Sequence, residues 1–360
     1  MRRPVRGPSL PSVLLLGLTL SACGSSSAAS PTSTATATGA SSTATPYPTL
    51  TVGLVTDVGG LHDKSFNRGA NLGLKAAERQ FGITGNVVES KRLSDYLPNL
   101  RRFAQQNTGL TIAVGFSMQN AVYQVAGEFP NDKFALVDAA PTDARNRVRN
   151  LSNVANLFFK EQESGYLVGV IAGLMEKNKV GKATHGVIGY MGGVSIPAVD
   201  RYLAGYVAGA QQVDPAIKIL GGYAQSFENP RVGLSIGLGQ INRHADILFQ
   251  VAGASGQGYL SAAQQRGVYG IGADSNQRYL GPYIIASALK RIKVAVKIVI
   301  RQAQIGQFFG GDHRLGLAQQ ATGFAVSNSI VPPAIVARAR AYARKIAAGS
   351  IVPPVRIPPH

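Results

Sequence analysis

Short apolar runs alternate with longer amphipathic stretches through most of this chain, and this alternation constrains the fold more than any other feature. The runs LTVGLV (50–55), TIAVGF (111–116) and KFALVD (133–138) have the length and β-branched content of buried strands. Helix-length segments separate them. Strands that alternate with helices indicate a mostly parallel sheet with helices on both faces. We therefore predict an α/β protein.

A second series of the same kind follows the first. Its strand-like runs are GVIGYM (186–191), IKILGGY (217–223), DILFQVAG (246–253) and VYGIGAD (268–274). Two consecutive doubly wound units of similar size predict two lobes with a cleft between them.

The N-terminus has the features of an export signal. Three arginines precede the apolar run 13–20, which is shorter than the roughly 20 residues that span a membrane. Residues 1–22 are predicted to be this signal, and LSAC (20–23) resembles a bacterial lipobox. Cys23 is the only cysteine, which excludes an intramolecular disulfide and favours lipidation at Cys23.

The linker at 23–48 is rich in Ser, Thr and Ala and has no charge. Such a segment cannot bury enough apolar surface to order itself, so we expect a disordered tether. The whole chain has a net charge of +18, but its basic residues are scattered and form no nucleic-acid-binding motif. Nucleic acid is therefore not an expected partner. The surplus fits either a solvated basic surface or attraction to anionic lipid.

Motifs of catalysis and of cofactor binding are missing from the sequence. The five histidines are isolated, and neither a GxSxG elbow nor a GxxxxGK[ST] loop occurs, so we expect no enzyme, metal or cofactor. GASGQG (253–258) lacks the order of the dinucleotide fingerprint. It follows a strand and leads a helix, so Gly253 can let a hydroxyl-rich ligand approach the backbone.

Aromatic and polar residues recur where the strands end. Phe66 and Asn67 follow the first strand, and Phe227 follows IKILGGY in the second unit. Each Phe fits either a packing role under its helix or stacking on a planar ligand, and the repetition favours stacking. Asp274 and Lys290 are strand-end charges suited to ribose hydroxyls, or else a helix cap and a surface lysine.

Several segments resemble the basic membrane protein family of lipid-anchored substrate-binding proteins of ABC transporters, which includes purine-nucleoside receptors. The resemblance runs from about 51 to 291, and its segments are VGLVTDVGGLHDKSFN, VGFSMQNAVYQVAGEFPNDKFALVDA, NVANLFFKEQESGYLVGVIAGLM, GYAQSFENPRVG, ILFQVAGASGQG and GIGADSNQ followed by IIASALKR. It implies the type I periplasmic-binding-protein fold, in which three crossovers join two Rossmann-like lobes and the ligand lies in the hinged cleft.

The resemblance also implies roles for individual positions. Phe66 and Asn67 would stack on and hydrogen-bond the base, with Phe227 as the second stacking ring. The predicted ligand-binding positions are Asp57, Phe66, Asn67, Asn120, Phe227, Gly253, Asp274 and Lys290. Asn120 stands where the family usually has an Asp, which weakens the assignment of that position to ribose or base.

We expect lobe 1 at 49–157 and about 283–310, lobe 2 at 158–282 and about 311–350, and a tail at 351–360. The expected function is capture of a purine nucleoside and its delivery to an ABC permease and its ATPase. The protein would be lipid-anchored at the outer face of the cytoplasmic membrane. The alternatives are a receptor for another small ligand, such as a sugar or signalling molecule, and a Rossmann-like envelope enzyme.

Overall fold

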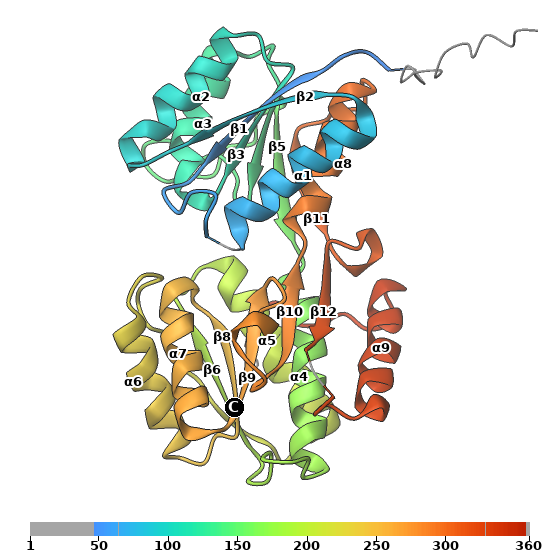
Figure 1. The fold of residues 1–360 in the computed structure, drawn as a ribbon. Coiled ribbons are helices and arrows are strands. Elements are labelled where there is room, and N and C mark those ends of the chain that lie inside the picture. Colours follow the sequence, from blue (N-terminus) through green and yellow to red (C-terminus); the bar gives the residue numbers. More distant parts are fainter. Residues whose placement is uncertain (1–46, 64, 328, 358–360) are drawn as a thin grey trace, which may run out of the picture. The chain divides into compact units, whose positions relative to one another are not determined.

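The computed structural model describes residues 47–63, 65–327 and 329–357. These residues form two six-stranded sheets, with strand orders β11-β5-β4-β3-β1-β2 and β12-β10-β9-β8-β6-β7 (Figure 1). All the pairings are parallel except that of β10 with β12. The predicted α/β class with two mostly parallel sheets is confirmed.

The first sheet is covered by two helices on each face (Figure 1). Helix α1 buries Ala70, Leu74 and Ala77, spaced by four and three residues, and packs beside α8. Helices α2 and α3 cover the other face. The elements of this lobe are β1 (Thr51–Thr56), α1 (Phe66–Phe81), β2 (Thr84–Glu89), α2 (Tyr96–Gln105), β3 (Leu110–Val114), α3 (Gln119–Glu128), β4 (Phe134–Val137), β5 (Val154–Phe159), α8 (Ile292–Gln304) and β11 (Gly311–Leu315).

The second sheet has the same layered arrangement. Helices α4, α5 and α9 share one apolar cluster with the sheet, and α6 and α7 cover its other face. The elements of this lobe are α4 (Glu161–Lys177), β6 (Val187–Gly192), α5 (Pro197–Val213), β7 (Lys218–Leu220), α6 (Pro230–Ile241), β8 (Ile247–Val251), α7 (Gly253–Arg266), β9 (Tyr269–Asp274), β10 (Ile284–Lys290), β12 (Thr322–Val326) and α9 (Pro333–Ala347).

The chain passes between the lobes at three places: after β5, after β10 and after β11. Two of the expected lobe boundaries are therefore wrong. We assigned 283–310 to lobe 1, but β10 pairs with β9 and β12 in the second sheet, and only the following helix α8 joins lobe 1. We assigned 311–350 to lobe 2, but β11 pairs with β5 in the first sheet. Strand partners depend on long-range pairing, which local apolar patterns do not encode.

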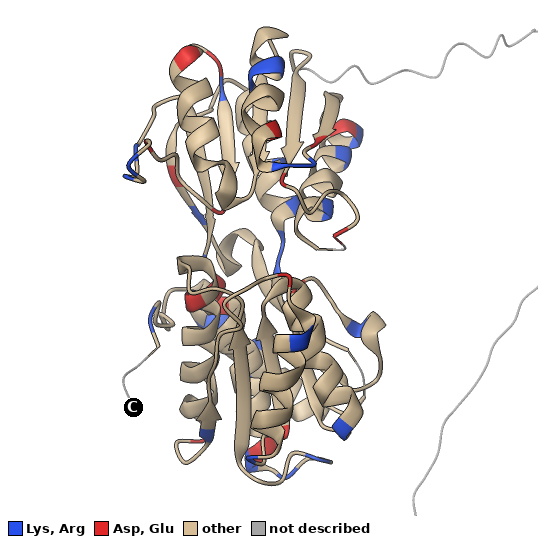
Figure 2. Ribbon diagram, turned by 90° about the vertical axis from the view of Figure 1, so that its left-hand side faces the viewer, with Lys and Arg blue, Asp and Glu red and all other residues tan. Residues whose placement is uncertain are grey.

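Lys and Arg are spread over helices and loops of both lobes (Figure 2). In the part of the chain that the structure describes, no helix has the length and apolar character needed to cross a bilayer. The predicted signal peptide, Cys23 and the linker up to residue 46 lie outside the described residues.

Candidate functional site

Most of the predicted site residues lie at the carboxyl ends of parallel strands, the edge where open α/β sheets bind ligands. In lobe 1, Asp57 follows β1, and Phe66 and Asn67 open α1. In lobe 2, Gly253 opens α7 after β8, while Asp274 ends β9 and Lys290 ends β10.

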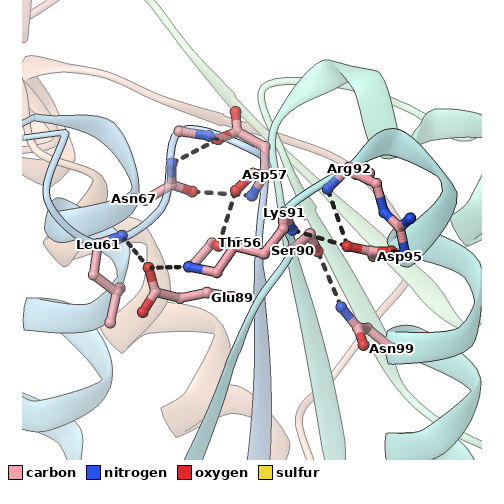
Figure 3. Close-up of polar contacts among 11 residues, drawn as sticks. Thr56, Asp57, Leu61, Asn67, Glu89, Ser90, Lys91, Arg92, Asp95 and Asn99 are labelled. Atoms are coloured by element: carbon pink, nitrogen blue, oxygen red, sulfur yellow. Dashed lines mark hydrogen bonds and ion pairs between the residues drawn. The ribbon is translucent and has the colours of Figure 1, made fainter.

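Asp57 and Asn67 form a reciprocal pair in lobe 1 (Figure 3). The Asn67 side-chain amide donates to Asp57 Oδ1 at 2.6 Å, and the Asp57 backbone N–H donates to Asn67 Oδ1 at 3.2 Å. Asn67 is only 1% exposed. Burial raises the pKa of Asp57 above its ordinary value, while the bond from Asn67 opposes this shift. The pair therefore fixes the turn between β1 and α1.

Lys290 links the two lobes through an ion pair. Its side chain is 3% exposed, and its ammonium group forms ion pairs with Asp138, which follows β4 in lobe 1, and with Glu161 Oε1 at 3.2 Å. The Lys290 Nζ atom also lies 5.7 Å from the centroid of the Phe66 ring and 5.1 Å from that of Phe159. Cation–π attraction acts over these distances, so Phe66 and Lys290 lie in one constellation.

Three carboxylates keep the Lys290 ammonium group protonated. Burial acts to lower the pKa of Lys290, but Asp138, Glu161 and Asp274 outweigh it and hold that pKa above its usual range. Burial raises the pKa of Asp138 to about 6 despite the opposing effect of Lys290. Burial also raises the pKa of Asp274, whose Oδ1 accepts a hydrogen bond from the Tyr202 hydroxyl at 3.0 Å. Lys290 is therefore a stable cation among acids.

Two polar atoms beside this constellation have no partner within the described residues. Oδ1 of Asp138 and Oγ of Ser275 are both buried and make no hydrogen bond there. Asp138 and Asp274 both adopt left-handed backbone conformations, with φ of 68° and 61°. Such conformations are uncommon for residues other than glycine and cluster at functional sites. Each of these two buried atoms therefore keeps a hydrogen-bonding capacity that the described residues do not use.

Phe227 and Gly253 form a separate contact in lobe 2. The Ser255 backbone N–H donates to the Phe227 carbonyl at 3.1 Å, and a Cβ atom on Gly253 would lie 3.0 Å from that oxygen. Gly253 has a φ of +57°, which favours glycine. Phe227 is half-buried against the lobe 2 core. Within the described residues, Phe66 and Phe227 form no ring pair.

Asn120 lies apart from the Lys290 constellation in its contacts. Its amide donates to the Thr142 carbonyl at 3.3 Å, and its oxygen accepts from Gln124 at 2.5 Å. The Asn120 amide thus connects α3 to the loop after β4, and the Asn120 oxygen bonds to the next turn of α3.

The sequence prediction missed four residues of the constellation: Asp138, Glu161, Arg201 and Tyr202. Arg201 Nε donates to Glu161 Oε2 at 2.6 Å. Asp138 had a usable signal, because it ends the predicted strand 133–138 as Asp274 ends its own. Glu161 and Arg201 had none, since both lie in amphipathic helical segments where charges are ordinarily solvent-exposed.

The first turn of α4 binds the other crossovers. Glu163 Oε2 accepts hydrogen bonds from the Leu317 N–H and from the Thr322 hydroxyl. The Ser164 hydroxyl donates to the Leu289 carbonyl at 2.7 Å and accepts from the Gly323 N–H at 3.0 Å. The segment EQES therefore fastens all three connections at one point beside Lys290.

Within the described residues, no group of three or more His, Cys, Asp or Glu side chains is arranged to hold a metal. The site instead offers aromatic faces, a buried cation and carboxylates, a combination suited to an organic ligand with hydroxyl groups.

This fold and site define a solute-binding protein of the type I periplasmic-binding-protein class. The chain is similar to the crystal structure of an ABC transporter solute-binding protein from Aeropyrum pernix K1, with a TM-score of 0.70 and 28% identity over 85% of this chain and 94% of that one. The predicted fold is thereby confirmed.

A sequence model of the Bmp family, described as ABC transporter substrate-binding protein PnrA-like, matches residues 50–355. The chain belongs to this family. It is 31% identical to a CD4+ T-cell-stimulating antigen of Listeria monocytogenes, over 98% of this chain and 99% of that protein. It is also 31% identical to the ABC transporter nucleoside-binding protein BmpA of Lactococcus lactis, over 73% of this chain and 77% of that one. The family consists of ABC transporter substrate-binding proteins rather than enzymes.

Proposed function

We propose that this protein captures a purine nucleoside between its two lobes and delivers it to the permease and ATPase of an ABC importer. The observation that carries the proposal is the Lys290 constellation, in which lobe 1 contributes Phe66 and Asp138 and lobe 2 contributes Lys290 and Asp274. A ligand that contacts all four residues favours one relative position of the lobes. Only that differential affinity can drive closure.

In the proposed complex, the Phe66 ring stacks on the base and Phe227 covers its other face. The Asp274 carboxylate accepts from the ribose hydroxyls, Lys290 donates to them, and Gly253 admits the ligand close to the backbone. Asn67 is buried and both its amide and its oxygen bond to Asp57, so in place of the direct base contact expected from the sequence it positions the Asp57 carboxylate next to the base. The orphan Asp138 Oδ1 atom provides a further acceptor.

We further propose that the protein is exported and held at the outer face of the cytoplasmic membrane by a lipid on Cys23. The support is the lipobox-like LSAC sequence, together with relatives such as an archaeal lipoprotein from Pyrococcus furiosus that is 31% identical over 76% of this chain. The signal at 1–22 would direct export, and the linker at 23–48 would connect the lipid anchor to the folded lobes.

A receptor for another small ligand is the second candidate. Asn120 favours it, because an amide occupies the position where the family usually has a carboxylate and both of its groups have protein partners. A ligand without a base or a ribose would then use the same strand ends differently.

A thermal-shift panel separates the two candidates. At a ligand concentration of 100 times the dissociation constant, binding stabilises a protein by about 2.7 kcal/mol. We expect inosine, guanosine or adenosine to raise the melting temperature of the wild-type protein and to have less effect on Phe227→Ala. A response to a sugar with none to any nucleoside would support the second candidate and exclude the first.

A further inference from the structure

A cavity of about 330 Å³ opens at the amino ends of the lobe 2 strands, at the opposite edge of the sheet from Gly253 and Asp274. Its size lies within the range of small-ligand pockets. The residues that line it are His185, Val187, Lys218, Leu220, Arg243 and His244. None of these belongs to the proposed nucleoside site.

His185 is held in one orientation by a buried carboxylate. Its Nδ1 atom lies 2.9 Å from Oδ1 and 3.0 Å from Oδ2 of Asp246, which is 4% exposed. Because a carboxylate accepts, Nδ1 carries the proton and Nε2 remains for a ligand. The ring stacks on His244 with 5.0 Å between centroids and 26° between planes. The hydrogen bonds to Asp246 and the stacking on His244 therefore preorganise the His185 ring for ligand binding.

The charges around the cavity are unbalanced. Lys218 and Arg243 are exposed, and neither forms an ion pair in the described part of the chain. Asp246 is already used by His185 and by the N–H groups of Thr184 and His185. Glu176, which also lies near Asp246, is 3% exposed, and burial together with the charges of Asp246 and Asp214 raises its pKa to about 8. Lys218 and Arg243 therefore bring to the cavity lining two cations that have no ion-pair partner among the described residues.

We propose that this cavity binds a phosphate group. The guanidinium of Arg243 provides a planar fork of N–H donors that matches two phosphate oxygens, and Lys218 adds a point charge. In the tautomer set by Asp246, His185 Nε2 is an acceptor and can receive a hydrogen bond from a protonated phosphate oxygen. Val187 and Leu220 form an apolar wall that accommodates the carbon chain of a phosphate ester. The phosphate group has two sources, free phosphate in solution and the headgroup of a phospholipid.

Calorimetry of the full-length protein tests the proposal, with inorganic phosphate in one arm and monomeric dihexanoylphosphatidic acid in the other. The double variant Lys218→Ala/Arg243→Ala should weaken binding about tenfold or more, because it removes charge-assisted hydrogen bonds. His244→Gln should weaken it less. Arg340→Ala, which removes an exposed cation from α9, is the matched control and should bind as the wild type does.

Tighter binding of the phosphatidic acid than of phosphate identifies the lipid headgroup as the source, and equal binding identifies free phosphate. Absence of binding in both arms overturns the proposal, as does binding that the double variant leaves unchanged. Exposed positions tolerate these substitutions, and circular dichroism checks the fold. The proposal is independent of the nucleoside site, so all the variants should retain the wild-type response to inosine.

Discussion

At the scale of single residues, Asp274 distinguishes recognition of ribose from general capture of a small molecule. We predict that Asp274→Asn weakens inosine binding about tenfold or more, because a carboxylate accepting from hydroxyl groups is worth more than a neutral amide. The binding of 2′,3′-dideoxyinosine should change little, since it lacks the hydroxyls concerned. Calorimetry with both nucleosides gives the comparison.

Asp200→Asn is the matched control for that experiment. Asp200 is also a lobe 2 aspartate that accepts a hydrogen bond from a tyrosine, the Tyr223 hydroxyl at 2.7 Å. The Asp200→Asn variant should bind inosine and 2′,3′-dideoxyinosine with the affinities of the wild type. If Asp274→Asn weakened both nucleosides equally, Asp274 would not read the ribose diol.

Glu176 predicts how stability depends on pH. Burial raises its pKa from 4.5 to about 8, so the folded protein holds this proton more tightly than the unfolded chain does. Protonated Glu176 therefore adds its full contribution to the free energy of unfolding below pH 4.5, and this contribution is lost as the pH rises through 8. Glu176→Gln keeps an acceptor for the Gly186 N–H, which lies 2.9 Å from Glu176 Oε2, but does not titrate.

Urea unfolding at pH 5 and pH 9 measures this effect. The free energy of unfolding of the wild type should fall between these pH values by a few kcal/mol more than that of Glu176→Gln, since each pKa unit corresponds to about 1.4 kcal/mol. Equal changes in the two proteins would show that Glu176 is not the group responsible.

How much of the site could be predicted depended on where each residue lies in the chain. Phe66, Asp274 and Lys290 were found because they follow recognisable strands, and parallel strands end at one edge of a sheet. Glu161 was not, because its place beside Lys290 results from a crossover between lobes, and a local sequence pattern does not specify a crossover. Their binding roles remain predictions.

At the scale of elements, helices α4 and α5 pack with their backbones in contact through glycines. Gly165 and Gly169 on α4 lie against the carbonyls of Tyr202 and Tyr206, and Gly209 on α5 lies against that of Tyr166. A Cβ atom at any of these positions would clash with backbone atoms, which cannot move without separating the helices.

We therefore predict that Gly169→Ala lowers the free energy of unfolding by about 1–3 kcal/mol, as overpacking of a dense core does. Gly239→Ala is the control, because Gly239 is a helical glycine with open space around its Cβ position. It should stabilise by about 0.4–1 kcal/mol by restricting the unfolded chain. Chemical denaturation measures both. A neutral Gly169→Ala would contradict the close packing.

The strands that sequence reasoning missed have a physical explanation. β5 contains Asn156, a residue type depleted in strands, which donates to Asp312 of β11 at 3.1 Å. β11 itself is a five-residue edge strand, GDHRL, with three charged or ionisable side chains. The six-residue strand β5 is buried along almost its whole length, so its composition rather than its exposure explains why it was missed, whereas β11 is both short and polar.

At the scale of the whole molecule, the two lobes are connected where ligand recognition is proposed to occur. Ser164 and Glu163 fasten the crossovers, and Lys290 joins the end of β10 to Asp138 of the other lobe. A ligand that competes for these charges acts on the hinge and on both binding surfaces at once. This coupling provides a route from binding to recognition by the permease.

Calorimetric titration of the full-length protein with inosine, and separately with ribose, tests the central claim most directly. The account predicts that inosine binds and that ribose alone binds far more weakly. It also predicts that Phe66→Ala loses about 1–3 kcal/mol of inosine affinity, the value of one stacked base, while Phe309→Ala on the lobe 1 surface loses none. Equal affinity for ribose and inosine, unchanged in Phe66→Ala, would contradict it.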